Sequence, residues 1–391
     1  MIKKYFRFFR ICLFFTVILM GLVGCNTVTS NTSAATTMSP SITITGISTI
    51  ASTMASTTTS ITNFPTPATT TTITALSTSS QTTTAPSILD SPQGEYLFGI
   101  IKSSDGNQWF AESIGNKISK ISPQTGQITK YNIPTANAWP TGITADSAGN
   151  LWFMENLGNK IGKICSSTGV ITEYNIPNTY GSTITFGPDG NLWFPTVYNI
   201  SEFSPKSDAI TTYSLPNSSA NTSDGLVDIT PGSDGNLWFT EQNKIGKISP
   251  LTGQITEYNI PIANAGPKGI TNGPDGNLWF TEANANQIGK ISPLTGQITE
   301  YNIPTNDSYP VRITAGPDGD LWFTEQNGNQ IGKISSQTGQ ITEYSIPTPS
   351  AGPFDITAGL DGNLWFTEEN VNNIGKIYAA TGIITEYPVD N

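Results

Sequence analysis

The stretch Gly273-Pro274-Asp275-Gly276-Asn277-Leu278-Trp279-Phe280-Thr281-Glu282 recurs, with changes, seven times between residues 105 and 391. Neighbouring copies lie 41 to 45 residues apart, counted between their marker tryptophans, which are Trp109, Trp152, Trp193, Trp238, Trp279, Trp322 and Trp365. A period near forty, made of short β-like runs between turn residues, is typical of a β-propeller blade. We therefore predict an all-β fold, a seven-bladed β-propeller with four antiparallel strands per blade.

Each copy divides into four expected strands. The first, such as 269–271, leads into an Asp-Gly pair, which favours a two-residue hairpin turn because glycine accepts positive φ. The second, 278–282, is apolar on both faces, as expected for blades stacked against neighbours. The third and fourth, 287–292 and 297–303, are joined by a Thr-Gly turn, and a proline ends the fourth.

The third copy is degenerate. It has Pro195-Thr196 where the fourth to seventh copies have Thr-Glu, and Ser207-Asp208-Ala209 replaces the Thr-Gly turn. The first blade begins at Tyr96 and the seventh ends at Tyr387, so each blade is expected to be one continuous segment. Whether residues 88–93 add an outer strand to the last blade remains open.

The N-terminus resembles a targeting segment. Four basic residues precede an apolar stretch, 11–23, that is short for a membrane span, and Leu22-Val23-Gly24-Cys25 has the form of a bacterial lipobox. We predict a lipoprotein signal peptide over residues 1–24 and lipidation of Cys25, which would place the protein outside the cytoplasm, lipid-anchored to the cell membrane. The alternative is ordinary secretion with a chance cysteine.

Residues 25–92 are expected to form a disordered tether between this anchor and the propeller at 93–391. No charged residue occurs from 26 to 89, where Thr and Ser dominate, so the stretch lacks the apolar pattern that would offset ordering entropy. Loss of the signal leaves 14 Lys and Arg against 29 Asp and Glu, a net charge of −15. That charge argues against nucleic acid as a partner, and a monomer is expected. Cys165 would be the remaining cysteine, so no intramolecular disulfide is expected.

The motifs Pro-x-Gly-Ile-Thr, Asp-Gly-Asn-Leu-Trp-Phe-Thr-Glu, Asn-x-Ile-Gly-Lys-Ile and Ile-Thr-Glu-Tyr-x-Ile-Pro recur through residues 96–391. In this combination the chain resembles the streptogramin B lyase family, typified by virginiamycin B lyase. The resemblance implies a seven-bladed propeller that linearises a cyclic depsipeptide antibiotic by elimination. It also implies a magnesium ion held by carboxylates and a histidine general base near the channel mouth.

The chain departs from that family in its catalytic residues. Val311 and Phe354 stand where the family places histidines, Gly352 stands where it places an acidic residue, and the whole chain contains no histidine. Elimination needs a base to remove a proton beside a carbonyl, and the residue whose pKa best suits that task is missing. The same absence excludes a Ser-His-Asp triad and a histidine zinc site. The fold is therefore expected to carry over more readily than the reaction.

Two sets of residues are candidates for a site. Six second strands end in glutamate, and of these Glu325 and Glu368 are metal candidates, unless each glutamate instead caps a local loop. The residues after the proline vary while the scaffold is nearly constant, which is compatible equally with function there and with drift on solvent-exposed loops. The ligand-binding candidates at the channel mouth are Phe98, Thr141, Ser182, Val227, Lys268, Val311, Arg312, Phe354 and Asp355, with Asp228 as a further charge at the rim.

Three hypotheses of function follow. The first is a surface-anchored, non-catalytic propeller that binds a small molecule, peptide or envelope component at the channel mouth. The second is a carbon-oxygen lyase of the streptogramin type, with magnesium and with carboxylates in place of histidine. The third is a structural module of the envelope.

Overall fold

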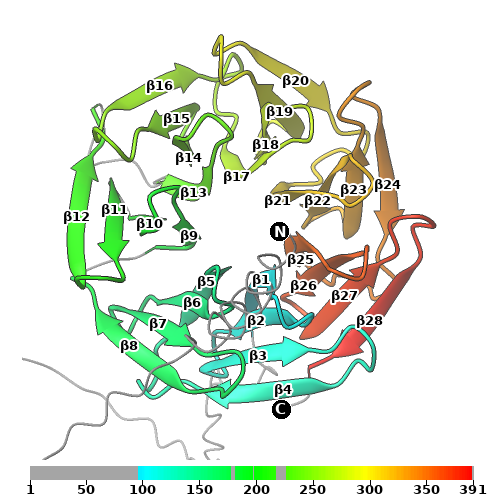
Figure 1. The fold of residues 1–391 in the computed structure, drawn as a ribbon. Coiled ribbons are helices and arrows are strands. Elements are labelled where there is room, and N and C mark those ends of the chain that lie inside the picture. Colours follow the sequence, from blue (N-terminus) through cyan, green and yellow to red (C-terminus); the bar gives the residue numbers. More distant parts are fainter. Residues whose placement is uncertain (1–95, 178–180, 197, 217–225, 390–391) are drawn as a thin grey trace, which may run out of the picture. The chain divides into compact units, whose positions relative to one another are not determined.

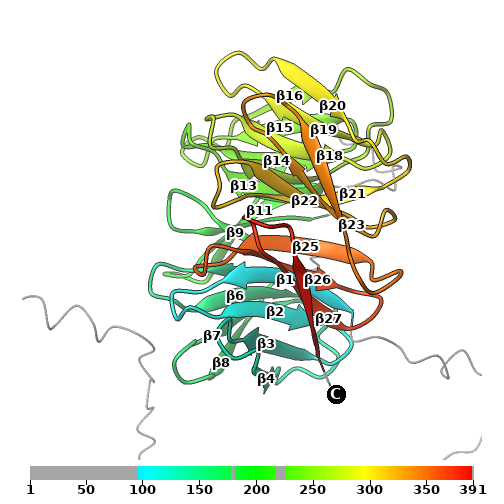
Figure 2. The same cartoon turned by 90° about the vertical axis from the view of Figure 1, so that its right-hand side faces the viewer.

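The seven repeats form a closed ring of blades. The structure is a computed structural model that describes residues 96–177, 181–196, 198–216 and 226–389. Within these ranges, 28 strands form seven four-stranded antiparallel sheets, each built from four strands consecutive in the chain. The first strand of each sheet lies innermost and the fourth outermost (Figure 1), and Figure 2 shows the ring from its side. The predicted seven-bladed β-propeller is confirmed.

The strands follow the repeat closely. Blades 1 to 3 comprise β1 (Leu97–Lys102), β2 (Gln108–Glu112), β3 (Lys117–Ile121), β4 (Ile128–Asn132); β5 (Pro140–Ala145), β6 (Leu151–Glu155), β7 (Lys160–Ile164), β8 (Ile171–Asn175); and β9 (Thr185–Phe186), β10 (Leu192–Pro195), β11 (Asn199–Ser204), β12 (Ala209–Ser214). Blades 4 and 5 comprise β13 (Leu226–Pro231), β14 (Leu237–Glu241), β15 (Lys244–Ile248), β16 (Ile255–Asn259); and β17 (Pro267–Asn272), β18 (Leu278–Glu282), β19 (Gln287–Ile291), β20 (Ile298–Asn302). Blades 6 and 7 comprise β21 (Pro310–Ala315), β22 (Leu321–Glu325), β23 (Gln330–Ile334), β24 (Ile341–Ser345); and β25 (Pro353–Ala358), β26 (Leu364–Glu368), β27 (Asn373–Ile377), β28 (Ile384–Pro388).

The degenerate third blade keeps four strands, but its first strand, β9, is only two residues long.

The described part of the chain contains no helix of the length and apolar character needed to cross a membrane.

The Asp-Gly turn has three residues in its loop, not the predicted two. Gly273 N donates to Asn277 O at 2.7 Å, and Gly276 N donates back to Gly273 O at 3.1 Å, so the loop is residues 274–276. Gly276 has φ of 78°, as expected for a three-residue hairpin whose last loop residue is left-handed.

The aspartate of this turn also anchors the marker tryptophan. Asp275 Oδ1 accepts hydrogen bonds from Asn277 N at 3.2 Å and from Trp279 Nε1 at 3.0 Å. The indole is fully buried, and its N–H would be costly to bury without an acceptor. One carboxylate thus shapes the turn and allows the tryptophan to enter the core.

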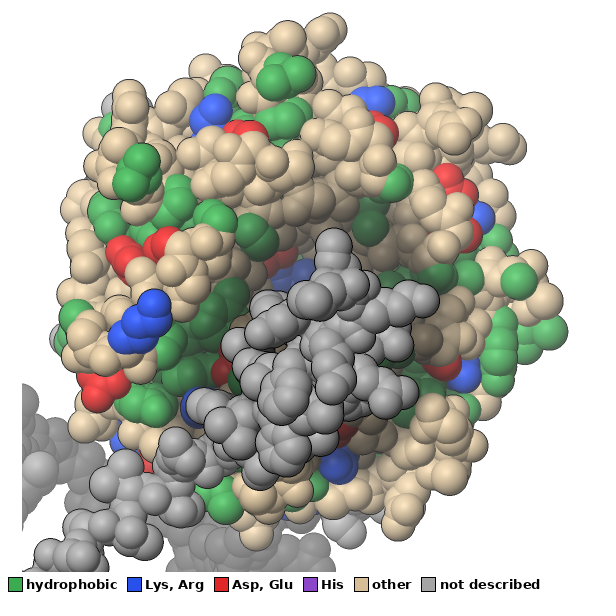
Figure 3. All heavy atoms as spheres, in the orientation of Figure 1, with side chains coloured by type: hydrophobic (Ala, Val, Ile, Leu, Met, Phe, Trp, Pro, Cys, Tyr) green, Lys and Arg blue, Asp and Glu red, His purple; other side chains and the backbone are tan. Residues whose placement is uncertain are grey.

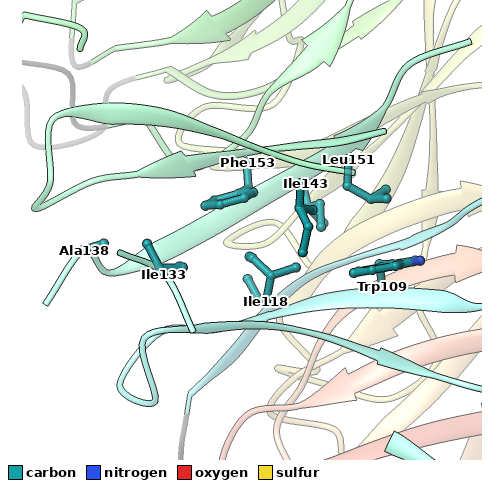
Figure 4. Packing of buried hydrophobic residues seen from close by; sticks show 9 residues of the cluster. Trp109, Ile118, Ile133, Ala138, Ile143, Leu151 and Phe153 are labelled. Atoms are coloured by element: carbon teal, nitrogen blue, oxygen red, sulfur yellow. The ribbon is translucent and has the colours of Figure 1, made fainter. Parts of the chain in front are cut away.

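The core lies between neighbouring blades. Figure 4 shows the interface of blades 1 and 2, where Trp109 and Ile118 from blade 1 pack against Ile143, Leu151 and Phe153 from blade 2. Each indole therefore completes the core that its own blade shares with the next blade. The six other interfaces within the described residues have clusters of the same kind.

In blades 4, 5 and 6, the threonine near the end of the second strand forms a hydrogen bond to the first strand of the next blade. Thr281 Oγ1 accepts from Gly269 N of its own blade at 2.9 Å and donates to Val311 O of the next blade at 2.9 Å. Thr240 and Thr324 make the same pair of bonds. Blades 1 to 3 have Ala111, Met154 and Pro195 at this position, so these side chains supply no hydroxyl for the bridge.

Blades 7 and 1 close the ring by side-chain packing. Trp365 packs against Leu97 and Ile100 of blade 1, and Asp355 Oδ2 accepts from Ile100 N at 2.8 Å. Each sheet consists of consecutive strands, as predicted. Residues 88–93, the expected signal peptide and the expected tether lie outside the described residues.

The expectation of no intramolecular disulfide is wrong for Cys165. This residue is disulfide-bonded in the structure.

Two glycines of blade 6 allow the cost of an unfavourable backbone angle to be compared with the cost of a steric overlap. Gly319 has φ of 85° with open space around an added Cβ, whereas Gly339 has φ of 73° and a Cβ there would overlap the Tyr301 ring. We expect Gly319→Ala to cost about 1–2 kcal/mol of unfolding free energy. Gly339→Ala should cost about 1–3 kcal/mol more, because Tyr301 stacks on Trp279 and must move. Equal urea midpoints for the two variants would contradict the packing argument.

Candidate functional site

The two ends of the channel differ in the residues that they carry. Each first strand begins, and each second strand ends, at the same end, as the pairing of Pro310 with Glu325 shows. We call this end the mouth face. The Asp-Gly turns and the turns between third and fourth strands lie at the other end, which we call the Asp-Gly face. In Figure 3, acidic and basic side chains lie singly or in small groups around the ring.

An ion pair crosses the channel between blades that are not neighbours. Arg312 Nη1 of blade 6 lies 3.0 Å from Asp228 Oδ2 of blade 4, and Arg312 is only 7% exposed. Gly269 occupies the matching position of blade 5, where an added Cβ would come within 2.9 Å of the Arg312 backbone. The glycine therefore allows the first strands to approach closely and leaves the space through which Arg312 reaches Asp228.

Asp228 and Asp355, the two aspartates at the channel, both accept hydrogen bonds from backbone N–H groups. Asp228 accepts from Ile229 N at 2.9 Å and from Ile270 N at 3.1 Å. Asp355 accepts from Ile356 N at 2.9 Å and, as noted, from blade 1. Burial raises the pKa of Asp355, while Arg312 and the two N–H groups oppose that rise. Asp228, Arg312 and Asp355 line a small cavity of about 120 Å³ within the channel.

The candidate ligand-binding residues include an aromatic cluster. The Phe98 and Phe354 rings meet edge-on with centroids 4.9 Å apart, and Arg312 Cζ lies 5.7 Å from the Phe354 centroid. Residues from blades 1, 6 and 7 are thus brought together. The pairing of Arg312 with Asp228 was not foreseen, although opposite charges at one repeat position were a signal for it.

The other candidates stand apart from this cluster. Thr141 is buried and donates to Gly181 O at 3.2 Å, whereas Ser182 is exposed and donates to Val227 O at 2.8 Å. Val311 is buried, and Lys268 is half-buried with its carbonyl bonded to the threonine of the preceding blade.

The six glutamates that end second strands lie buried inside their own blades. Five of them face a second glutamate on the fourth strand: Glu155 with Glu173, Glu241 with Glu257, Glu282 with Glu300, Glu325 with Glu343, and Glu368 with Glu386. In the first blade Lys130 replaces the second glutamate and lies 3.3 Å from Glu112. Burial and the neighbouring carboxyl raise the pKa of Glu282, Glu325 and Glu368 to about 8.

The residues present do not fit the magnesium ion that the resemblance implies. Glu325 and Glu368, the predicted metal candidates, each face one carboxyl of their own blade, and both side chains are fully buried. Val311, Gly352 and Phe354 offer no side-chain oxygen at the mouth, although magnesium requires oxygen ligands. In the described ranges, no group of three or more His, Cys, Asp or Glu residues is arranged to hold a metal.

The glutamate pairs predict a stability that falls as the pH rises. The pKa of these glutamates is about 8 in the folded protein, against 4.5 for an ordinary glutamate, so the folded protein binds more protons than the unfolded chain between these pH values. This contribution is complete below about pH 4.5 and is lost as the pH rises through about 8. We expect the melting temperature to be lower at about pH 8.5 than at about pH 5.5. The triple variant Glu282→Gln, Glu325→Gln, Glu368→Gln should flatten this dependence.

Glu112→Gln is the matched control in blade 1. It removes the carboxylate that pairs with Lys130, so it should lower the melting temperature at both pH values. An unchanged pH dependence in the triple variant would show that the carboxyl pairs are not its source.

Comparison with known proteins identifies the family. A sequence model of the virginiamycin B lyase family matches residues 55–223 and 180–391. A streptogramin B lyase structure is 40% identical and superposes with a TM-score of 0.67, covering 73% of this chain and 93% of that one. Comparison with curated protein sequences found no match.

Two structures from Staphylococcus aureus are also similar. Selenomethionine-substituted virginiamycin B lyase is 41% identical, with a TM-score of 0.65 and coverage of 72% of this chain and 93% of that one. A catalytically inactive histidine-to-alanine variant of the same enzyme, with quinupristin, is 41% identical, with a TM-score of 0.67 and coverage of 73% and 95%. The chain therefore belongs to the virginiamycin B lyase family.

Proposed function

We propose that this propeller binds a ligand at its mouth face without catalysing the elimination reaction. The observation that carries the proposal is the absence of histidine from all 391 residues. In an elimination the base must contact the proton that it removes. At the positions that the family resemblance assigns to histidines, this chain presents Val311, which is buried, and Phe354, which packs on Phe98.

The nearby carboxylates are poor replacements for the base. Asp228 and Asp355 accept backbone hydrogen bonds that join blades 4 to 5 and 7 to 1, so moving them would disturb the ring. Glu325 and Glu368 have a raised pKa suited to a base, but both are fully buried and cannot reach a substrate without rearrangement. This arrangement supports recognition over turnover.

The mouth offers complementary chemistry to a ligand with rings and polar groups. The half-buried Phe98 and Phe354 rings supply apolar surface, and the exposed Ser182 and half-buried Lys268 supply polar groups. The similar virginiamycin B lyase structure with quinupristin supports a ligand of related kind. We therefore choose quinupristin as the first probe for the mouth of this protein.

We further propose that the protein is a lipoprotein of the cell surface. The lipobox at Cys25 and the uncharged Thr- and Ser-rich stretch that follows support an anchor and a tether. The tether would hold the propeller away from the membrane and leave its mouth free to meet a ligand.

Lyase activity is expected to be at least about a hundredfold below that of the Staphylococcus aureus enzyme, because a general base contributes about 10²–10⁴-fold. The measurement is mass spectrometry of quinupristin after incubation with the purified protein and magnesium, with the Staphylococcus aureus lyase as positive control. Calorimetry should detect binding of the intact antibiotic, weakened in Phe354→Ala. Linear product at the rate of the control would refute the non-catalytic proposal, and absence of binding would refute the choice of ligand.

Cys25→Ala should abolish lipidation, so that the variant leaves the membrane fraction and its N-terminal peptide loses the mass of the lipid. Peptide mapping without a reducing agent tests the alternative, in which Cys25 is not lipidated. A disulfide between Cys25 and Cys165 in the mature protein would contradict lipidation, because a thioether-linked sulfur cannot form a disulfide.

A further inference from the structure

A cavity on the Asp-Gly face has no role in the function proposed above. It has a volume of about 400 Å³ and lies between blades 2 and 3, at the end of the channel opposite the mouth. Its lining includes Trp152, Lys163, Phe186 and Lys206. Three departures from the repeat meet at this interface, and the first two of them favour a ligand.

The first departure leaves a lysine without its usual carboxylate. In five blades the third-strand lysine forms an ion pair with the Asp-Gly aspartate, at N–O distances from 2.7 to 4.0 Å. Blade 2 has Ala148 at the position of that aspartate. Lys163 lies 5.0 Å from the centroid of the Trp152 ring, and within the described residues it has no ion pair.

The nearby Asp146 does not supply the missing charge pairing. Its oxygens accept from Ala148 N at 3.0 Å, Asn150 N at 2.8 Å, Asn150 Nδ2 at 2.8 Å and Trp152 Nε1 at 3.1 Å. Asp146 therefore accepts the hydrogen bond of the indole, as the Asp-Gly aspartate does in the other blades. It does not form the ion pair that the same aspartate makes with the lysine. Lys163 and the exposed Lys206 both line the cavity.

The second departure lines the cavity with an aromatic ring. Phe186 stands at the last position of the first strand, where the other blades have Lys, Ala, Pro or Asn. Its ring meets Trp152 edge-on at 6.2 Å and remains half-buried. Pro188 and Pro205 add further apolar lining.

The third departure lies in the turn between the third and fourth strands of blade 3. In six blades the glycine of this turn lies against the tyrosine of the preceding blade, as Gly169 lies against Tyr131. Blade 3 has Asp208 there, with φ of 56°. Tyr174 of blade 2 stacks on Trp152 and also meets Phe203, with ring centroids 5.4 Å apart and planes tilted by 56°.

We propose that this cavity binds a small aromatic carboxylate. The ring would lie against Phe186 and the two prolines, and the carboxylate would pair with Lys163 and Lys206. The ligand would thus supply the negative charge that an aspartate supplies in five other blades. A charge-assisted contact in a partly apolar cavity is stronger than one in open water.

The test uses 2-naphthoate as the probe and calorimetric titration of the purified propeller. We expect saturable binding that weakens at least about tenfold in Ala148→Asp, which restores the aspartate of the other blades, and in Lys163→Gln. The neutral 2-naphthamide should bind at least about tenfold more weakly to the native protein. Lys290→Gln, the same change in blade 5, should leave the affinity unchanged.

The result that overturns the proposal is either no binding of 2-naphthoate at millimolar concentration or binding that both cavity variants retain. Unchanged melting temperatures would confirm that the variants are folded, and Ala148→Asp introduces the sequence that the other blades already tolerate. Equal loss in the Lys290→Gln control would assign the effect to overall charge and would also overturn the proposal.

Discussion

Each marker tryptophan belongs to two blades at once. Its backbone pairs within one sheet, and its indole fills the core shared with the next, as Trp279 does beside Ile313 and Leu321. A buried indole N–H without an acceptor would be costly, so the aspartate of the preceding turn is part of the same interaction. The turn, the core and the blade interface thus depend on one hydrogen bond repeated around the ring, and the position of the innermost strands follows from them.

The closeness of those innermost strands limits what the channel can contain. Where neighbouring first strands nearly touch, as at Gly269, there is no room for a Cβ atom. A larger side chain on a nearby first strand extends into the space that this glycine leaves. Arg312 and Asp228 occupy such space and become buried partners of one another. The charges that the sequence places at the rim are thereby used within the scaffold, and the aromatic residues at the neighbouring positions remain available to a ligand.

The fold could be predicted from the sequence because seven copies of one pattern average out local ambiguity. What the pattern could not reveal were contacts between blades. The pairing of Arg312 with Asp228 joins residues 84 positions apart, and it depends on how the ring closes. The six glutamates illustrate the same limit: a row of carboxylates in the sequence is compatible with a metal ring, yet the strand register turns each one toward a partner within its own blade. The loop length was misjudged because the backbone bond that closes the Asp-Gly turn is not encoded in residue type alone.

The continuity of each blade has a topological consequence. No sheet in the described part of the chain borrows a strand from the opposite end of the sequence, so the seam between the last blade and the first is closed by the same kind of packing as the other six. Leu97 and Val389 lie in one core cluster, and the two ends of the ring are therefore adjacent. A circular permutation that joins these ends and opens another interblade loop would leave every sheet intact. Such a permutation would keep the cyclic order of the blades around the axis and would change only the blade at which the chain begins.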